Sequence, residues 1–279
     1  MKKRRLIRKI CMAALMLAAM LAVLSACARK DPTAHEETVE ITDAFSAVAV
    51  QNRTYEMTVA ASEDGTVRAV FDASPKMTCT ASVENGVLTV RQTDLRKWYE
   101  KIFSWWKFGK RKLTLYLPAG EYGDLTVNSS SGGVAMKTGP FTFGNTDIQI
   151  SSGSFTAEGL FCKALSVRIS SGNAALSGCE AVSLSMKVSS GNMKLTETTV
   201  IGHSAVTLSS GSVMMEKFDA ATAEIRVSSG NVKGTILTAK NFETETSSGT
   251  IRIPDSDSAA GKWKIKVSSG SVDLSLAAG

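Results

Sequence analysis

The chain has 279 residues, of which 43% are hydrophobic, 6% aromatic and 21% charged. This composition excludes a wholly disordered chain and a protein that crosses a membrane many times. The formal net charge is +6, but residues 1–26 hold six of the 32 basic residues and no acidic one, which leaves 26 basic against 26 acidic residues in the remainder. The charge therefore gives no general argument for nucleic-acid binding, and we expect no nucleic-acid partner.

The first 26 residues have the pattern of a signal peptide. A basic segment over residues 1–9 precedes the uncharged apolar run Ile10–Ala26. As a helix this run would span about 25 Å, somewhat less than the roughly 30 Å hydrocarbon core of a bilayer. The length favours a secretion signal over a permanent span, and the alternative is an uncleaved anchor followed by a chance cysteine.

The run ends in Leu24-Ser25-Ala26-Cys27, which resembles the lipobox of bacterial lipoproteins. In that family the cysteine thiol receives a diacylglyceryl group and becomes the new N-terminus after cleavage. The resemblance implies that Cys27 carries acyl chains such as palmitate and holds the protein on the extracytoplasmic face of the bacterial cell membrane. Residues 27–42 are polar and are predicted to form a tether.

Residues 43–128 are predicted to form an N-terminal β region. Apolar and polar residues alternate along Phe45–Val50, Tyr55–Ala60, Thr66–Phe71, Met77–Val83 and Val87–Arg91. Asn85-Gly86, between the last two of these segments, is a strong signal for a β-hairpin. We expect this region to be an all-β cap or the irregular first coils of a longer structure.

An aromatic and basic segment over residues 96–112 interrupts this β region. Its candidate contact residues are Trp98, Tyr99, Trp105, Trp106, Lys107, Phe108, Lys110, Arg111 and Lys112. Tryptophan and tyrosine favour the membrane interface, and lysine and arginine favour anionic headgroups. The segment is therefore predicted to contact the membrane, an amphipathic peptide or another envelope protein. The alternative is that its aromatic side chains cover the end of the β structure.

Residues 129–279 contain an internal repeat. Ser-Ser-Gly occurs eight times, with glycines at 132, 153, 172, 191, 211, 230, 249 and 270. The intervals of 19–21 residues and the period-two alternation on both sides of each glycine predict parallel strands stacked one coil above the next. The predicted fold is all-β, a single-stranded parallel β-helix, and the alternative is a sandwich of hairpins. The glycine is expected to adopt a backbone conformation closed to other residues or to allow close approach of the next coil.

The repeat, together with the strands Phe45–Val50 and Leu113–Pro118, resembles the bacterial β-strand-repeat family whose members are labelled as adhesins by inference. The resemblance covers Phe45–Leu276 and implies an extracytoplasmic protein of the cell envelope; some members are encoded with envelope-stress systems. It supplies no catalytic residues. We therefore expect a non-catalytic, adhesin-like scaffold, with an envelope-stress component that senses or sequesters membrane-active peptides as the alternative.

Four basic residues, each four positions before a repeat glycine, are predicted to align on the outer face of the stack. A column of this kind could bind an anionic envelope polymer, although nearby acidic residues favour a solvated face as the alternative. The four residues are Arg168, Lys187, Arg226 and Lys266.

The sequence shows no catalytic or metal-ligating pattern. The closest acidic pair is Asp255 and Asp257, and the histidines, His35 and His203, have no matched serine and acid. We expect no enzyme activity, metal or cofactor, and a carbohydrate-processing β-helix enzyme is the least favoured alternative. Cys162 and Cys179 are expected to pack in the core, with a disulfide as the alternative.

The last predicted coil ends at Ser271–Leu276, with only three residues after it. Because unpaired strand edges invite association, we expect this uncapped C-terminal coil to be covered by a second copy or another protein.

Overall fold

The computed structural model describes residues 33–99 and 110–278. All twenty of its named elements are β-strands, and they form one continuous sheet, which confirms the all-β prediction. The strands are β1 His35–Ile41, β2 Ala47–Asn52, β3 Glu56–Ala61, β4 Val67–Ala73, β5 Met77–Glu84, β6 Val87–Asp94, β7 Lys112–Leu117, β8 Gly120–Tyr122, β9 Leu125–Ser129, β10 Val134–Met136, β11 Phe141–Ser152, β12 Phe155–Glu158, β13 Phe161–Ser171, β14 Ala174–Ser177, β15 Glu180–Thr196, β16 Thr199–Ile236, β17 Asn241–Ser248, β18 Ile251–Arg252, β19 Lys262–Ser269 and β20 Val272–Leu276.

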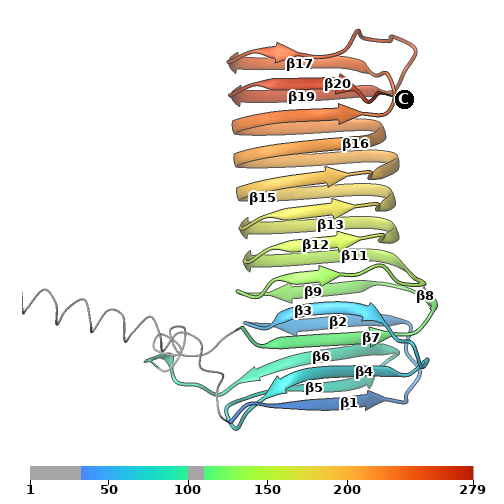
Figure 1. Cartoon of the computed structure of the whole chain (residues 1–279), viewed down its shortest axis with the longest axis vertical. Helices are drawn as coiled ribbons and strands as arrows, with labels where there is room; N and C mark the ends of the chain where they lie inside the picture. Colours follow the sequence, from blue (N-terminus) through green and yellow to red (C-terminus); the bar gives the residue numbers. More distant parts are fainter. Residues whose placement is uncertain (1–32, 100–109, 279) are drawn as a thin grey trace, which may run out of the picture.

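Each Ser-Ser-Gly repeat forms one coil. In several coils a long strand precedes the bend and a short strand follows it, as β11 and β12 do, whereas β15 and β16 continue through their bends. Figure 1 shows these coils stacked one above another. Long strands pair in parallel with long strands, as at Ile148–Val167–Met186, and short strands pair with short strands, as β12 does with β14. The register advances by one repeat per coil, so equivalent residues form columns along the stack.

The interior of the stack is apolar because every second side chain points inward. Val167, Met186, Val206 and Ile225 hold equivalent inward positions in four coils, and each is at most 1% exposed. Their polar neighbours in sequence point outward. The alternation read from the sequence therefore sets which face of each strand is buried.

The repeat glycines form a column of close backbone contacts. Seven of them, from Gly153 to Gly270, have φ between +132° and +154°, a region that other residues rarely adopt. A Cβ atom added at Gly211 would lie 1.7 Å from the carbonyl oxygen of Gly191. Both reasons expected for glycine are thus confirmed, since the backbone conformation and the next coil exclude a side chain.

The N-terminal end of the stack has mixed strand pairing. β1 pairs antiparallel with β4, β4 pairs antiparallel with β7, and β5 and β6 form an antiparallel hairpin. At the hairpin turn, Asn85 and Gly86 both have positive φ. Because His35–Ile41 is a strand of this end, the prediction of a tether over residues 27–42 is wrong for these residues. The tether prediction overlooked the alternation of Thr38-Val39-Glu40-Ile41, which is weak because all but two of the β1 side chains are exposed.

At the C-terminal end the coils do not follow the order of the chain. β19 pairs with β16 on one side and with β17 on the other, so the last long strand lies between two earlier ones. β20 lies in the same way between β16 and β18. The glycine column agrees, because a Cβ at Gly270 would meet the carbonyl oxygen of Gly230, and one at Gly249 would meet that of Gly270. Figure 1 shows β17 beyond β19 and β20.

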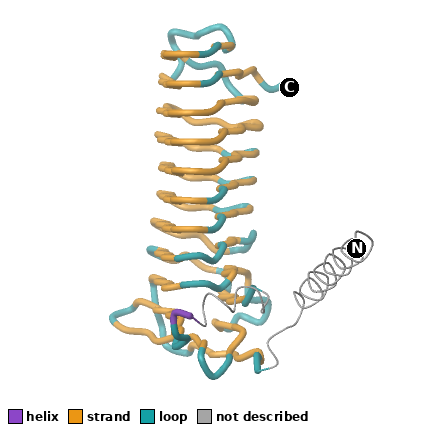
Figure 2. Tube along the Cα trace, turned by 90° about the vertical axis from the view of Figure 1, so that its left-hand side faces the viewer, coloured by secondary structure: helices purple, strands orange, loops and turns teal. Residues whose placement is uncertain are grey.

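The prediction of an uncapped C-terminal coil is therefore wrong, because β17 and β18 cover it. In the outermost strand, β17, Thr244 and Thr246 take positions where most other coils have buried apolar residues. Both threonines are half-buried, as the outermost position in the stack allows. The loop over residues 253–261 adds a further cover (Figure 2), with Ser256 Oγ accepting a 2.9 Å hydrogen bond from Phe242 N. These polar substitutions suit the end of a stack and not its middle.

Side chains beneath the outermost coil fix the exchanged order. Trp263 is fully buried in β19 and donates a 3.1 Å hydrogen bond from Nε1 to the carbonyl oxygen of Ala220. Lys240 Nζ lies 2.6 Å from Asp219 Oδ1, with both side chains largely buried, and also lies over the Trp263 ring. A buried ion pair of this kind is stable only when both partners are present.

The cysteines of the described residues are free. Cys79 and Cys179 are buried and Cys162 is half-buried, which agrees with core packing and not with a disulfide. Burial raises the pKa of the Cys162 thiol to about 12, with the neighbouring Cys179 adding to the shift. Burial, with a smaller contribution from Glu37, raises the pKa of Cys79 to about 12 as well.

Candidate functional site

A polar groove lies along the bends of the N-terminal half of the stack and has a volume of about 700 Å³. We call it the bend groove. It extends across six strands, because its lining comes from β2, β6, β9, β11, β13 and β15 and from the bends that follow them. The lining residues are Gln51, Asn52, Arg53, Arg91, Gln92, Asn128, Ser129, Ser130, Gln149, Ile150, Ser151, Arg168, Ile169, Ser170, Lys187 and Ser189.

One column of outward side chains runs the length of this groove. The strand register places its six members next to one another in the order Arg91, Gln51, Asn128, Gln149, Arg168 and Lys187. Neighbouring members are one strand apart, about 4.8 Å, so the column is about 24 Å long. The first serine of each adjacent Ser-Ser-Gly bend, as in Ser151 and Ser170, forms a parallel row of hydroxyl groups.

The groove is positively charged, since the described residues that line it include four basic ones and no acidic one. Among the described residues, Arg53, Arg91 and Lys187 have no acidic partner within ion-pair distance. Arg168 Nη1 lies 3.0 Å from Asp147 Oδ1, but its side chain remains 57% exposed. An exposed pair of this kind contributes little to stability and leaves guanidinium donors free for a ligand.

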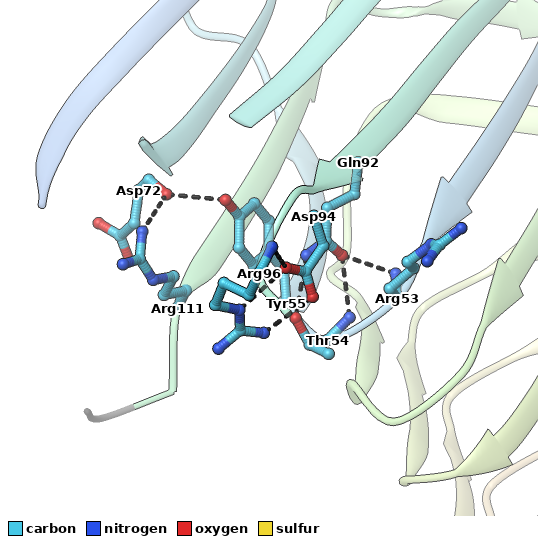
Figure 3. Close-up of polar contacts among 8 residues, drawn as sticks. All are labelled: Arg53, Thr54, Tyr55, Asp72, Gln92, Asp94, Arg96 and Arg111. Atoms are coloured by element: carbon cyan, nitrogen blue, oxygen red, sulfur yellow. Dashed lines mark hydrogen bonds and ion pairs between the residues drawn. The ribbon is translucent and has the colours of Figure 1, made fainter. Parts of the chain in front are cut away.

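Buried amide side chains hold the N-terminal end of the groove in place. Gln92 Oε1 accepts hydrogen bonds of 2.6 Å from Arg53 N and 2.9 Å from Thr54 N, as Figure 3 shows. Asn52 Nδ2 donates to the Tyr55 carbonyl oxygen at 2.6 Å and to Ser129 Oγ at 3.0 Å. The bend over residues 52–55 has no Ser-Ser-Gly sequence, and these side-chain hydrogen bonds hold it instead. They also fix the backbone that carries Arg53.

The structure separates the four residues of the predicted basic stripe into two pairs. Arg168 and Lys187 are neighbours in the groove, whereas Arg226 and Lys266 are neighbours further along the stack and outside it. Arg226 Nη2 lies 2.5 Å from Glu224 Oε1, and Lys266 Nζ forms an ion pair with Glu245. Both members of the distal pair thus have acidic partners, whereas in the groove Arg168 has one and, among the described residues, Lys187 has none.

Sequence reasoning missed Arg53 and Arg91, because it counted columns only from the Ser-Ser-Gly repeats. A usable signal exists in the strand Phe45–Val50, whose alternation has the same phase as the repeats. Val50 pairs with Val127, which places Gln51 in the column and Arg53 at the bend. Arg91 enters the column through the pairing of β6 with β2, which no repeat marks.

The aromatic and basic segment begins next to the groove. Two residues after Gln92, Asp94 accepts two 2.9 Å hydrogen bonds from the Arg96 guanidinium (Figure 3). Trp98 is 74% exposed and Tyr99 43% exposed, so these two side chains do not cover the end of the stack. The predicted contact residues Trp105, Trp106, Lys107 and Phe108 lie outside the described residues, as does Cys27.

The segment rejoins the stack through three basic residues. Lys110 Nζ lies 2.7 Å from Glu56 Oε1 and is 81% exposed. Arg111 Nη1 donates to the Asp72 carbonyl oxygen, which also accepts from Tyr55 Oη (Figure 3). The Lys112 backbone N donates to Asp72 Oδ2 at 2.8 Å. Arg111 and Lys112 thus help to anchor the start of β7, while Lys110 remains at the surface.

In the described part of the chain, the titratable residues do not meet the requirements of a metal site. They contain no group of three or more histidine, cysteine or acidic residues that could hold a metal ion. His203, in β16, contacts Thr222 Oγ1 through Nδ1 at 2.9 Å and is exposed. In the part of the chain that the structure describes, no helix combines the length and apolar character needed to cross a bilayer.

Comparison with known protein families identifies the family of this chain. The family model Toastrack DUF4097 matches residues 35–217 and again residues 201–278. These two matches extend over nearly every described coil, and the chain belongs to this family. Among curated proteins, no relative matches.

Several solved structures match the chain at low sequence identity. A candidate lipid-binding protein from Parabacteroides distasonis is 15% identical, with a TM-score of 0.50, and the match covers 86% of this chain and 97% of that one. A candidate adhesin from Bacteroides fragilis is 10% identical (TM-score 0.46; 88% and 98% covered), and a candidate cell adhesion protein from Clostridium sporogenes is 11% identical (TM-score 0.29; 88% and 100% covered). At 15% identity the likeness to the Parabacteroides distasonis protein concerns the fold alone.

Proposed function

We propose that this protein is a lipid-anchored scaffold of the bacterial cell envelope that binds its target without catalysis. In this proposal residues 1–26 are a secretion signal, acylated Cys27 holds the chain on the extracytoplasmic face of the membrane, and the stacked coils form a β-solenoid that presents an adhesin-like surface. The observation that carries the proposal is the bend groove, a charged and elongated surface built on a rigid apolar core. A sheet that holds the backbone in place suits recognition, because the backbone need not be ordered on binding.

The anchor is tested by metabolic labelling with palmitate and by cell fractionation. The wild-type chain should incorporate the label and sediment with membranes. Cys27→Ala removes the thiol that takes the lipid, so the label should be lost. Cys79→Ala is the matched control, because its thiol is buried in the sheet and should not be acylated. Equal labelling of the wild type and the Cys27→Ala variant would contradict lipid attachment at Cys27.

A second candidate function is an envelope-stress component that senses or sequesters membrane-active peptides. The exposure of Trp98 and Tyr99 beside Lys97 favours it, because aromatic and basic side chains together suit a lipid surface or an amphipathic peptide. A chain of residues 33–279, which carries every described strand, should bind vesicles containing anionic lipid. Trp98→Ser with Tyr99→Ser should weaken this binding.

The control for the vesicle experiment is Leu95→Ser. Leu95 is also exposed, at 69%, but it precedes the aromatic pair. If the double variant and this control bind vesicles as well as the unchanged chain does, the described part of the segment has no membrane role. A carbohydrate-processing enzyme receives no support from the groove, whose lining lacks the paired acids that such chemistry generally uses.

A further inference from the structure

We propose that the bend groove binds an acidic polysaccharide, a carbohydrate chain that carries carboxylate or phosphate groups. The inference rests on the proposed non-catalytic binding function and adds the class of ligand and the residues that bind it. Four properties of the groove support it: its length, its charge, the polar groups between the charges, and the absence of aromatic side chains from its lining.

The length of the groove suits a polymer better than a small molecule. Its column has six members from Arg91 to Lys187 and extends for about 24 Å along the stack. Sites for small molecules are usually enclosed and mostly apolar. The bend groove is instead lined almost entirely by polar side chains from successive coils, so it offers a repeated pattern to a repeated ligand.

The charges stand at the two ends of the groove. Arg53 and Arg91 are at the N-terminal end, and Arg168 and Lys187 are at the other. Arginine binds carboxylate and phosphate groups through paired hydrogen bonds, and lysine binds them as a point charge. The ligand therefore carries negative groups that can meet the basic residues at both ends of the groove at once.

The middle of the groove offers hydrogen-bonding groups without charge. Gln51, Asn128 and Gln149 supply amide donors and acceptors, and the serine row adds hydroxyl groups. Such groups match the hydroxyl groups of sugar residues. Gln149 Nε2 already donates to Asp147 Oδ2, but its carbonyl oxygen remains available as an acceptor.

The lining separates a polysaccharide from a nucleic acid. Sites for single-stranded nucleic acid combine a basic groove with aromatic side chains on which the bases stack. Among the described residues that line the bend groove none is aromatic, and the apolar ones are Ile150 and Ile169. The groove can therefore bind the charges of a nucleic acid but gives its bases no platform.

The test measures binding of the full chain, in nonionic detergent, to polygalacturonate and to dextran phosphate at low salt. Uncharged dextran and an oligothymidylate of similar length are the comparison ligands. Arg91→Gln with Lys187→Gln removes one charge from each end of the groove, and should weaken binding of the acidic polysaccharides about tenfold or more. Arg226→Gln with Lys266→Gln removes the same charge outside the groove and should change affinity less than about twofold, as expected for exposed and already paired charges.

A third variant guards against misfolding of the double variants. Ser170→Asp adds a negative charge within the groove at an exposed position and should also weaken binding. The proposal is overturned if neither acidic polysaccharide binds, if uncharged dextran or the oligothymidylate binds as tightly, or if both double variants lose affinity equally. Because the assay uses purified protein, loss of the membrane anchor in cells would contradict the proposed localisation and leave this result unaffected.

Discussion

At the N-terminal end of the stack the outermost strands run antiparallel, whereas at the C-terminal end the coils remain parallel and exchange their order. The N-terminal end uses unique side chains, such as Asn52 and Gln92, to hold its bends. The C-terminal end uses the same repeat as the middle, with threonines in the outermost coil and the last coil placed beneath it. A repeat protein can thus close one end with new sequence and the other by rearranging its repeats.

The exchanged order can be tested with paired cysteines. Arg226 and Lys266 are outward neighbours on adjacent strands, whereas Arg226 and Glu245 are two strands apart. Arg226→Cys with Lys266→Cys should therefore form a disulfide under mild oxidation. Arg226→Cys with Glu245→Cys should not, because two strands are separated by about 9.6 Å and a disulfide needs Cα atoms within about 7 Å.

The cross-links are detected by mass spectrometry of peptides from the oxidised, folded protein. The two double variants share one cysteine, so each is the control for the other. A disulfide between positions 226 and 245, with none between 226 and 266, would show that the coils follow the chain order and would remove the difference between the two ends.

A side chain in the glycine column should cause the largest loss of stability. Gly211→Ala would place Cβ 1.7 Å from the Gly191 carbonyl oxygen, so the coils must separate there. Gly178→Ala is the matched control, because its φ is also positive but nothing lies within 4 Å of the added atom. We expect the control to lose about 1–2 kcal/mol from the strained backbone and Gly211→Ala to lose clearly more.

Thermal unfolding followed by circular dichroism measures both variants. Equal losses would mean that the column serves backbone conformation alone and that close contact between the coils contributes nothing. A greater loss for Gly211→Ala would show that close backbone contact between coils stabilises the middle of the stack. The same kind of contact is present at Gly270, where the coils exchange their order.

Much of this architecture is predictable from sequence, and the exceptions lie at the ends. The repeat sets the phase of each strand, so the inward residues Val167 and Met186 follow from the alternation alone. The order of the last coils does not follow, because every coil carries the same bend and spacing alone cannot show which coil is outermost. Thr244 and Thr246, which stand where most other coils have an apolar residue, are local signs that their coil lies at an end.

The candidate site was predictable only in part, for the same reason. Arg168 and Lys187 belong to the repeat and were found by their spacing from the glycine. Arg53 and Arg91 belong to the N-terminal end, where strand pairing is set by side-chain contacts far apart in sequence. The exposure of Arg226 and Lys266 was predictable, but their acidic partners depend on which strand lies beside which.

Loss of the Asn52 side chain should destabilise the N-terminal end by about 1–3 kcal/mol, because Asn52→Ala leaves buried hydrogen-bonding groups without partners. The affected groups are the carbonyl oxygen and the backbone N–H of Tyr55, which bond to Nδ2 and Oδ1 of Asn52. Asn128→Ala is the control, because this neighbouring amide is exposed and should lose less than about 0.5 kcal/mol. Chemical denaturation measures both, and equal losses would contradict a structural role for the buried network.

Raising the pH from 7 to 9.5 should lower the free energy of unfolding by a smaller amount, with contributions from the N-terminal end and from the repeat. Burial raises the pKa of Cys79, at the N-terminal end, and of Cys162, in the repeat, to about 12. The unfolded chain releases these protons above about pH 8.5 while the folded chain keeps them, so stability falls as the pH rises. Each thiol should contribute about 1 kcal/mol of loss at pH 9.5.

The pH dependence is measured by chemical denaturation at the two pH values. Cys79→Ala and Cys162→Ala should each remove part of the change, whatever their effect on stability at pH 7, and Cys179, whose pKa burial also raises, contributes to the remainder. A change that is the same in both variants as in the wild type would contradict the burial of these thiols.

The most direct test of the binding account is chemical footprinting of the basic residues with and without polygalacturonate. Phenylglyoxal labels arginines and an acetylating reagent labels lysines, and mass spectrometry reports each site. The account predicts protection of Arg53, Arg91, Arg168 and Lys187 together, with Arg226 and Lys266 still labelled in the same sample. Protection of Arg226 and Lys266, or of none of the six, would contradict binding in the bend groove.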